Sequence, residues 1–174
     1  MTIRLATESD LPTIVNIYNA SIPERMATAD LTPVSVASRR DWFLAHNPQK
    51  YPIFVKVKHD LVIGWLSFQA FYGRPAFHPT AEVSIYVVAE AQHQGIGQEL
   101  LAYGISQSPQ LGLKTLLGFI FGHNQASLRL FEKFGFERWG HLPQVAELDG
   151  VERDVVILGK RLEAADRRWA AHRR

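Results

Sequence analysis

The chain has 174 residues, of which 47% are hydrophobic and 21% charged, and its composition is typical of one soluble domain. It contains no cysteine, which excludes disulfides, thiolate metal ligands and a cysteine nucleophile, and its net charge of +2 is spread along the chain, which argues against a nucleic-acid partner. Nothing resembles a signal peptide or a membrane helix of roughly 18 apolar residues, so we expect a cytoplasmic protein with no membrane partner.

The first third of the chain predicts one strand and two helices. Residues 2–6 alternate polar and apolar side chains as a short strand does. Thr7 and Asp10 form a capping-box pattern that opens a helix. The Thr-Pro dipeptide at 32–33 is a second helix-start signal. That second helix is expected to end near residues 46–48.

The middle of the chain predicts three strands. Residues 52–59 and 61–71 are rich in β-branched and aromatic side chains, and the dipeptide at 59–60 between them indicates a hairpin. Residues 73–80 contain two prolines and are expected to form a loop. The apolar run at 81–88 then predicts another strand.

The second half of the chain continues the alternation of helices and strands. The expected elements are a helix at 96–107, a strand at 115–121, a helix opened by Asn124 or Ser127, and strands at 137–148 and 152–162. The dipeptide Asp149-Gly150 between the last two strands is a strong hairpin-turn signal. The order β-α-α-β-β-β-α-β-α-β-β predicts a mixed α/β domain around one sheet.

A glycine turn, "QHQGIG" at residues 92–97, separates a predicted strand from a predicted helix. Two glycines at a helix start let an anionic group approach the backbone, whose free N–H groups bind phosphate oxygens. A P-loop would need lysine directly after Gly97, where Gln98 stands. A dinucleotide fingerprint would need glycine or alanine where Leu100 stands. The pyrophosphate turn of acyl-CoA transferases, Gln/Arg-x-x-Gly-x-Gly/Ala, fits every position, and a purely structural turn is the alternative.

Four more stretches accompany this turn: "IYNASI", "GRPAFHPTAEVSIYV", "NQASLRLFEKFGF" and "LPQVAELDGVERDVV". Together they resemble the GCN5-related N-acetyltransferase (GNAT) superfamily, and within it the phosphinothricin or amino-acid sulfone/sulfoximine acetyltransferases. The resemblance implies a GNAT fold, with a mixed, mostly antiparallel central sheet, a splayed strand pair and helices on both faces. It implies one domain over residues 1–162, a basic C-terminal tail at 163–174, and a two-fold homodimer.

The resemblance also implies acetyl-CoA as the co-substrate. In that family the strand before the glycine turn binds the thioester and the pantetheine arm, the turn binds the pyrophosphate, and the asparagine of the following helix contacts the pantetheine region. His78 and His123 lack metal-ligand spacing, so we expect no metal. The implied cofactor-binding residues are Ile85, Tyr86, Val87, His93, Gln94, Gly95, Ile96, Gly97, Gln98 and Asn124.

Glu82 lies on the same predicted strand, and period-two alternation places it on one face with Ser84 and Tyr86. A carboxylate in an apolar strand must be partnered, exposed or functional. A solvent-facing glutamate is the alternative to the general base, acting through a water, that the resemblance implies. Arg74 offers bidentate recognition of an acceptor carboxylate. The implied acceptor-binding residues are Tyr72, Gly73, Arg74, Glu82, Val83 and Ser84.

The general acid is unassigned. Many members of the superfamily carry a tyrosine seven residues after the helix asparagine, and Phe131, which cannot donate a proton, stands there. The predicted activity is acetyl transfer to the amine of a small amino-acid-like substrate. Another amine (an aminoglycoside, a polyamine or a protein N-terminus) and a non-catalytic acyl-CoA-binding module are the alternatives.

Overall fold

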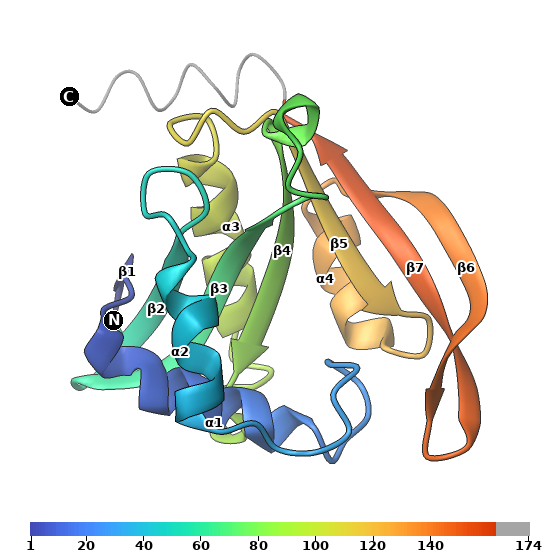
Figure 1. Ribbon diagram of the computed structural model, residues 1–174, viewed down its shortest axis with the longest axis horizontal. Coiled ribbons are helices and arrows are strands. Elements are labelled where there is room, and N and C mark those ends of the chain that lie inside the picture. Colours follow the sequence, from blue (N-terminus) through green and yellow to red (C-terminus); the bar gives the residue numbers. More distant parts are fainter. Residues whose placement is uncertain (163–174) are drawn as a thin grey trace.

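A computed structural model describes residues 1–162, which form a seven-stranded sheet of order β1-β2-β3-β4-β5-β7-β6 (Figure 1). The expectation of a basic tail at 163–174 lies outside the described residues. The strands are β1 (Thr2–Leu5), β2 (Ile53–Lys58), β3 (Leu61–Ala70), β4 (Thr80–Val87), β5 (Thr115–Phe121), β6 (Glu137–Leu148) and β7 (Val151–Arg161). The helices are α1 (Leu11–Ser21), α2 (Val36–Leu44), α3 (Ile96–Gln107) and α4 (Gln125–Lys133), with 3-10 helices η1 (Glu8–Asp10), η2 (Pro75–Phe77) and η3 (Ala89–Ala91).

The element order agrees with the prediction, and both hairpins form where turn chemistry placed them. His59 and Asp60 have φ angles of 48° and 63°, and Asp149 and Gly150 have φ angles of 52° and 79°. Positive φ at both central residues is what a type I′ hairpin turn requires. Local sequence therefore sets the pairing next to each turn. Farther from the turns the register shifts, between Lys56 and Val57 in β2 and between Leu142 and Ala146 in β6.

The predicted start of the second helix is wrong. Residues 32–33 do not open it; Ser35 caps α2, and its side chain accepts a backbone N–H bond of 3.0 Å from the first turn. The cause is a contact with α1. Asn19 donates its side-chain amide to the Val34 carbonyl at 2.8 Å and accepts the Val34 N–H at 2.9 Å. This pair uses both backbone groups of Val34 before the helix begins.

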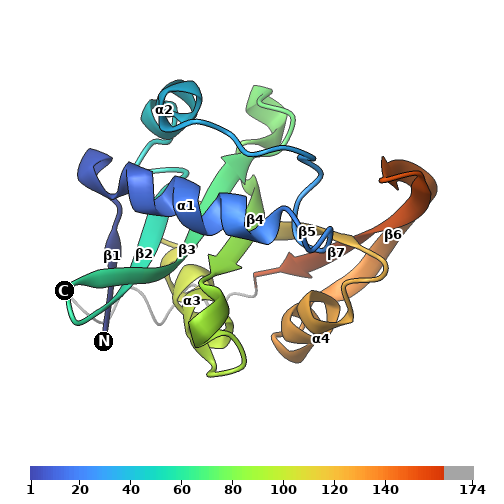
Figure 2. The same cartoon turned by 90° about the horizontal axis from the view of Figure 1, so that it is seen from below.

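Helices cover both faces of the sheet, as predicted: α1 and α2 lie on one face, and α3 and α4 on the other (Figure 2). Because successive strand residues point to opposite faces, neighbouring side chains of β3 enter different cores. Trp65 packs with Ile14 of α1, whereas Leu66 packs with Leu100 of α3. Alternate residues of β3 and β4 therefore contact different helices: one set packs against α1 and α2, and the other against α3 and α4.

The splayed strand pair is also confirmed. The only parallel pairing in the described sheet joins β4 to β5, and it covers three residues, from Thr80 with Thr115 to Glu82 with Leu117. Beyond Glu82, β4 continues alongside β3 and β5 continues alongside β7, so the two strands diverge (Figure 1). Among residues 1–162, no helix is long and apolar enough to cross a membrane.

Candidate active site

The second half of β4 directs main-chain groups toward the side from which β5 has diverged. The Val88 N–H donates to the carbonyl of Ile63 in β3, at 3.0 Å, whereas the Pro79 carbonyl accepts the Thr115 N–H at the start of β5, at 3.2 Å. Backbone groups of alternate residues point to opposite sides of a strand. The N–H groups of Ile85 and Val87 therefore point away from β3, beyond the last residue that pairs with β5, where they can donate to a ligand.

The glycine turn places a helix N-terminus next to this part of β4. Gly95 is the N-cap of α3, with φ of 82° and ψ of 2°. The first bond of the helix joins the Glu99 N–H to the Gly95 carbonyl at 3.0 Å. The N–H groups of Ile96, Gly97 and Gln98 therefore have no partner within the helix, and they lie at its positive end. This arrangement suits a phosphate group.

The two positions of the turn, Gly95 and Gly97, require glycine for different structural reasons. A Cβ on Gly95 would meet nothing within 4 Å, so its left-handed backbone angle is what requires glycine. A Cβ on Gly97 would lie 3.2 Å from Cδ2 of Leu130 in α4. Gly97 therefore permits close packing of α3 against α4, a role that the sequence alone did not indicate.

The other residues of the turn differ in whether their side chains are accessible to a ligand. His93 and Gln94 are exposed, and His93 has a φ of 60°. Gln98 is exposed and accepts a 2.7 Å bond from the Lys133 ammonium. Ile96 is only 3% exposed and its side chain belongs to the core, so only its backbone can meet a cofactor.

Asn124 is 7% exposed and caps α4. Its amide oxygen accepts the Ser127 N–H at 3.1 Å, and its amide nitrogen donates to the Met26 carbonyl at 3.0 Å. His123 holds the same α1–α2 connection, through a 2.7 Å bond between Nε2 and the Arg25 carbonyl. Asn124 thus ties this connection to the β5–α4 corner, and its contact with the pantetheine arm stays a prediction.

The face of β4 opposite α3 carries a row of polar side chains. In the β3–β4 register Gln69 lies opposite Glu82, Ser67 opposite Ser84, and Trp65 opposite Tyr86. The predicted common face of Glu82, Ser84 and Tyr86 is therefore confirmed. A pocket of about 130 Å³ lies on this face, lined by Ile14, Val15, Tyr18, Arg39, Trp42, Trp65, Ser67, Gln69, Ser84 and Tyr86.

Glu82 stands at one end of this row and is half-buried. Burial raises the pKa of its carboxyl group, and no basic side chain among residues 1–162 offsets that effect. A carboxylate with a raised pKa is a better proton acceptor near neutral pH than an ordinary surface glutamate. The environment of Glu82 thus fits a general base, although its catalytic role stays a prediction.

Tyr86 has its side chain in the pocket rather than on the cofactor side of β4. Its ring stacks on Trp65 with 4.6 Å between centroids and meets Tyr18 edge-on at 5.1 Å. Burial raises the pKa of its hydroxyl far above the usual range, so this group stays protonated. Any cofactor contact of Tyr86 must therefore come from its backbone.

The loop expected to bind the acceptor adjoins Glu82. Ala70, the last residue of β3, pairs with Ala81, so the chain enters the loop beside the start of β4. Tyr72 and Gly73 follow with φ angles of 54° and 64°. The Tyr72 side chain is 75% exposed, and Arg74 is also exposed.

Val83 and Phe131 face the core. Val83 is 5% exposed and points away from the pocket, so only its backbone can line an acceptor site. Phe131 is 4% exposed and packs so closely on Gly118 that a Cβ there would lie 2.8 Å from the ring. No group of three His, Asp or Glu side chains in residues 1–162 could hold a metal ion.

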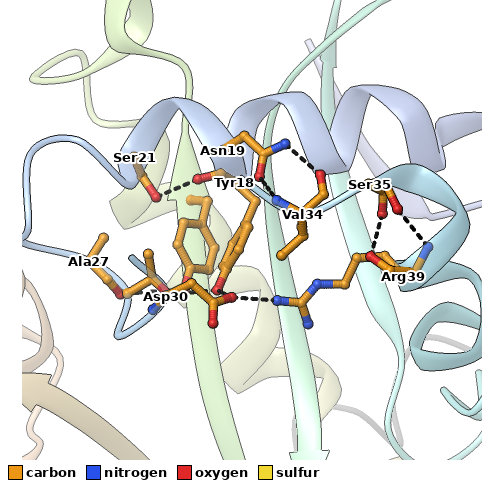
Figure 3. Close-up of polar contacts among 11 residues, drawn as sticks. Tyr18, Asn19, Ser21, Ala27, Asp30, Val34, Ser35 and Arg39 are labelled. Atoms are coloured by element: carbon orange, nitrogen blue, oxygen red, sulfur yellow. Dashed lines mark hydrogen bonds and ion pairs between the residues drawn. The ribbon is translucent and has the colours of Figure 1, made fainter. Parts of the chain in front are cut away.

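Sequence reasoning missed several residues of the pocket. Ser67 and Gln69 did carry a signal, because they are polar side chains at alternate positions of an otherwise apolar strand. Arg39 carried none, since its position depends on where α2 begins. Figure 3 shows Arg39 reaching from α2 toward Asp30, next to Tyr18 of α1.

Residues 12–136 match the model of the Acetyltransferase (GNAT) family. The chain belongs to this family. A Bacillus subtilis (strain 168) protein named "Putative phosphinothricin acetyltransferase YwnH" is 47% identical over 163 residues, covering 93% of this chain and 99% of that relative. An L-methionine sulfoximine/L-methionine sulfone acetyltransferase of Pseudomonas paraeruginosa (strain DSM 24068 / PA7) is 34% identical, covering 92% of this chain and 94% of its own.

The fold of this GNAT protein is also found in solved structures. The crystal structure of a GNAT superfamily phosphinothricin acetyltransferase from Sinorhizobium meliloti, in complex with AcCoA, superposes with a TM-score of 0.88. It is 31% identical in sequence, and the match covers 92% of this chain and 88% of the other. The splayed β4–β5 pair and the glycine turn therefore belong to an acetyltransferase fold.

Proposed function

We propose that this protein is a cytoplasmic N-acetyltransferase whose single catalytic domain, residues 1–162, uses acetyl-CoA to acetylate small amino-acid-like amines. The acceptor class is that of phosphinothricin and of methionine sulfone or sulfoximine, as the names of the relatives indicate. One observation carries the proposal. On β4, the half-buried carboxylate of Glu82 lies three residues before Ile85, whose N–H points toward the side from which β5 has diverged. The glycine turn follows this strand.

Acetyl-CoA, when bound, supplies the acetyl group as a thioester. The N–H groups of Ile96, Gly97 and Gln98 hold the pyrophosphate at the positive end of α3. The Ile85 N–H donates to the thioester oxygen and stabilises the charge that develops there. Glu82 accepts the proton of the acceptor amine through a water.

Departure of the thiolate needs no tyrosine in this proposal. A CoA thiol has a pKa near that of cysteine, about 8.5, so the thiolate is a tolerable leaving group near neutral pH. Phe131 stands where many members of the superfamily carry a proton donor, and its ring has no group that can donate a proton. We assign no general acid.

The test is a screen for CoA release from acetyl-CoA. Candidate acceptors are phosphinothricin, methionine sulfone, methionine sulfoximine, common amino acids, an aminoglycoside, a polyamine and a peptide with a free N-terminus. The proposal expects release with the amino-acid analogues. Preference for a polyamine, an aminoglycoside or the peptide would show that the proposed acceptor class is wrong and would identify the class that the enzyme uses. Tight CoA binding with no release for any amine would favour a non-catalytic acyl-CoA-binding module.

Arg74→Ala should raise the Michaelis constant for the amine and leave that for acetyl-CoA unchanged. A desolvated arginine–carboxylate pair would contribute roughly 2–5 kcal/mol to binding. Arg74 is exposed, so its pair with a carboxylate is screened by solvent, and we expect only a rise of about 1.4- to 5-fold, in line with about 0.2–1 kcal/mol for exposed pairs. Steady-state kinetics against both substrates measures this. Parallel rises in both constants would assign Arg74 a structural role.

We also propose a two-fold homodimer that covers β6. This strand is one of the two sheet edges and exposes large apolar side chains, with Trp139 at 46%, Leu142 at 40% and Val145 at 56%. A long edge strand with exposed apolar side chains invites pairing with another chain. Light scattering at micromolar concentration should give about twice the 19.7 kDa of one chain. A species of single-chain mass across that range would reject the dimer.

A further inference from the structure

The pocket next to Glu82 extends along β4 in the direction that leads away from Arg74. The order along the strand is the loop that carries Arg74, then Glu82, then Ser84 opposite Ser67, then the aromatic pair of Tyr86 and Trp65. At about 3.3 Å per residue, Ser84 lies roughly 7 Å along β4 from Glu82. An amine held at Glu82 with its carboxylate toward Arg74 would therefore extend its side chain into the pocket.

The size and walls of the pocket suit a short side chain. Its volume is about 130 Å³, and an engineered apolar cavity of about 150 Å³ is known to bind benzene, a molecule of six heavy atoms. Ile14, Trp42 and Trp65 supply apolar walls for methylene groups. A sugar ring system or a long polyamine exceeds this space.

Two polar groups face the pocket with bonding capacity to spare. Ser67 is 2% exposed, and its hydroxyl forms no hydrogen bond with any other group in residues 1–162. Because Ser67 lines the pocket, this hydroxyl is available to bond a polar ligand there. Arg39 carries five N–H donors, of which one binds Asp30 at 2.9 Å, and the described part of the chain offers the others no acceptor.

The guanidinium of Arg39 is fixed in position before any ligand binds. It lies 4.8 Å over the Tyr18 ring and 5.6 Å over the Trp42 ring. Asp30, which binds Arg39, also accepts the Tyr18 hydroxyl, and Figure 3 shows these three side chains converging. Rings and carboxylate together limit the motion of a long side chain, so less entropy is lost when a ligand binds.

We infer that this pocket binds the side chain of the acceptor, and that Arg39 and Ser67 recognise oxygen atoms at the end of that side chain. A sulfone, sulfoximine or phosphinate group has the tetrahedral oxygens that an arginine and a hydroxyl can donate to. A side chain that ends in a cation would be repelled by the positive charge of Arg39. The inference rests on the proposed function, because that function places the amine at Glu82.

The experiment compares two acceptors that share the amino-acid end. Methionine sulfone carries terminal oxygens, and norleucine offers a similar aliphatic length without them. In Arg39→Met the preference for the sulfone, as a ratio of kcat/KM values, should fall about 10- to 100-fold, as expected for hydrogen bonds to a charged group. Ser67→Ala should reduce it about 3- to 10-fold. The KM for acetyl-CoA should not change in either variant.

Arg40→Met is the matched control, because Arg40 is the next residue of α2 and pairs with Glu8 on the surface. It should leave the preference at the wild-type value. If Arg39→Met does not fold, Arg39→Lys keeps the charge beside Asp30 without the planar fork and should give an intermediate loss. Equal losses for both acceptors, in either Arg39 variant, would overturn the inference and leave Arg39 a structural residue.

Calorimetry in the presence of CoA separates this inference from the proposed function. Wild-type protein that acetylates neither acceptor, yet binds the sulfone at least tenfold more tightly than norleucine and loses that difference in Arg39→Met, would refute the activity and support the pocket. Acetylation of both acceptors, with a preference for the sulfone that does not change in Arg39→Met, would support the activity and overturn the role inferred for the pocket. Neither acetylation nor binding would overturn both.

Discussion

Glu82→Gln should lower turnover by about 10²–10⁴-fold at neutral pH, the range in which positioned acid–base catalysis contributes. Glutamine keeps nearly the same shape as glutamate but cannot accept the proton of the amine. The affinity for acetyl-CoA should hardly change, because the expected cofactor contacts lie further along β4 and in the glycine turn. Steady-state kinetics and calorimetry with CoA measure the two quantities separately.

The pH profile of turnover adds a second measurement to this prediction. Burial raises the pKa of the Glu82 carboxyl, so the acidic limb of the wild-type profile should lie above the ordinary glutamate value of about 4.3. The limb should disappear in Glu82→Gln. Raising the pH should restore part of the rate of the variant, because more of the amine is then already neutral. If Glu82→Gln has a rate close to that of the wild type at neutral pH, and chemistry is shown to be rate-limiting, Glu82 is not the general base.

The same substitution should leave the fold at least as stable as before. Because the pKa of Glu82 is raised on folding, the folded state binds its proton more tightly than the unfolded state. Ionisation of Glu82 therefore lowers the free energy of unfolding as the pH rises from the unfolded pKa to the folded one. Glu82→Gln should gain stability at neutral pH, and the gain should vanish at acidic pH. Glu24→Gln, at an exposed position, is the control.

Predictions from the sequence succeeded where the determining contacts are local. The turn residues Asp149 and Gly150 set their hairpin by their own backbone preferences. Alternation along β4 placed Glu82 and Ser84 on one face, which the β3–β4 register confirms. The glycine turn was recognised because a strand, Gly95 and a helix follow one another within a few residues.

Predictions failed, or were not made, where contacts join distant segments. The start of α2 depends on bonds between Asn19 and Val34, fifteen residues apart, which no local helix-start signal encodes. The position of Arg39 in the pocket follows from that start. Gly97 is required by Leu130 of α4 as well as by the turn, and only tertiary packing reveals this. The pocket is thus assembled by the tertiary fold.

Gly95→Val should weaken acetyl-CoA binding about 10- to 100-fold while the protein still folds. Gly95 has a φ of 82°, and a Cβ there would meet no protein atom within 4 Å. The substitution therefore introduces no steric clash within the protein, but holding a β-branched residue in this conformation costs about 1–3 kcal/mol. We expect the turn to relieve that strain by rotating the N–H groups of Ile96 and Gly97 away from the proposed pyrophosphate site, which the new side chain would also enter.

Gly150→Val separates loss of the cofactor from loss of stability. Gly150 has a φ of 79°, and a Cβ there would likewise meet nothing within 4 Å, but this glycine lies at the tip of the β6–β7 hairpin. Both variants should lose about 1–3 kcal/mol of unfolding free energy, and only Gly95→Val should lose CoA affinity by calorimetry. S-acetylpantetheine, which has no pyrophosphate, should be used equally well by Gly95→Val and by the wild type. Unchanged CoA affinity in a folded Gly95→Val protein would show that the turn does not bind the pyrophosphate.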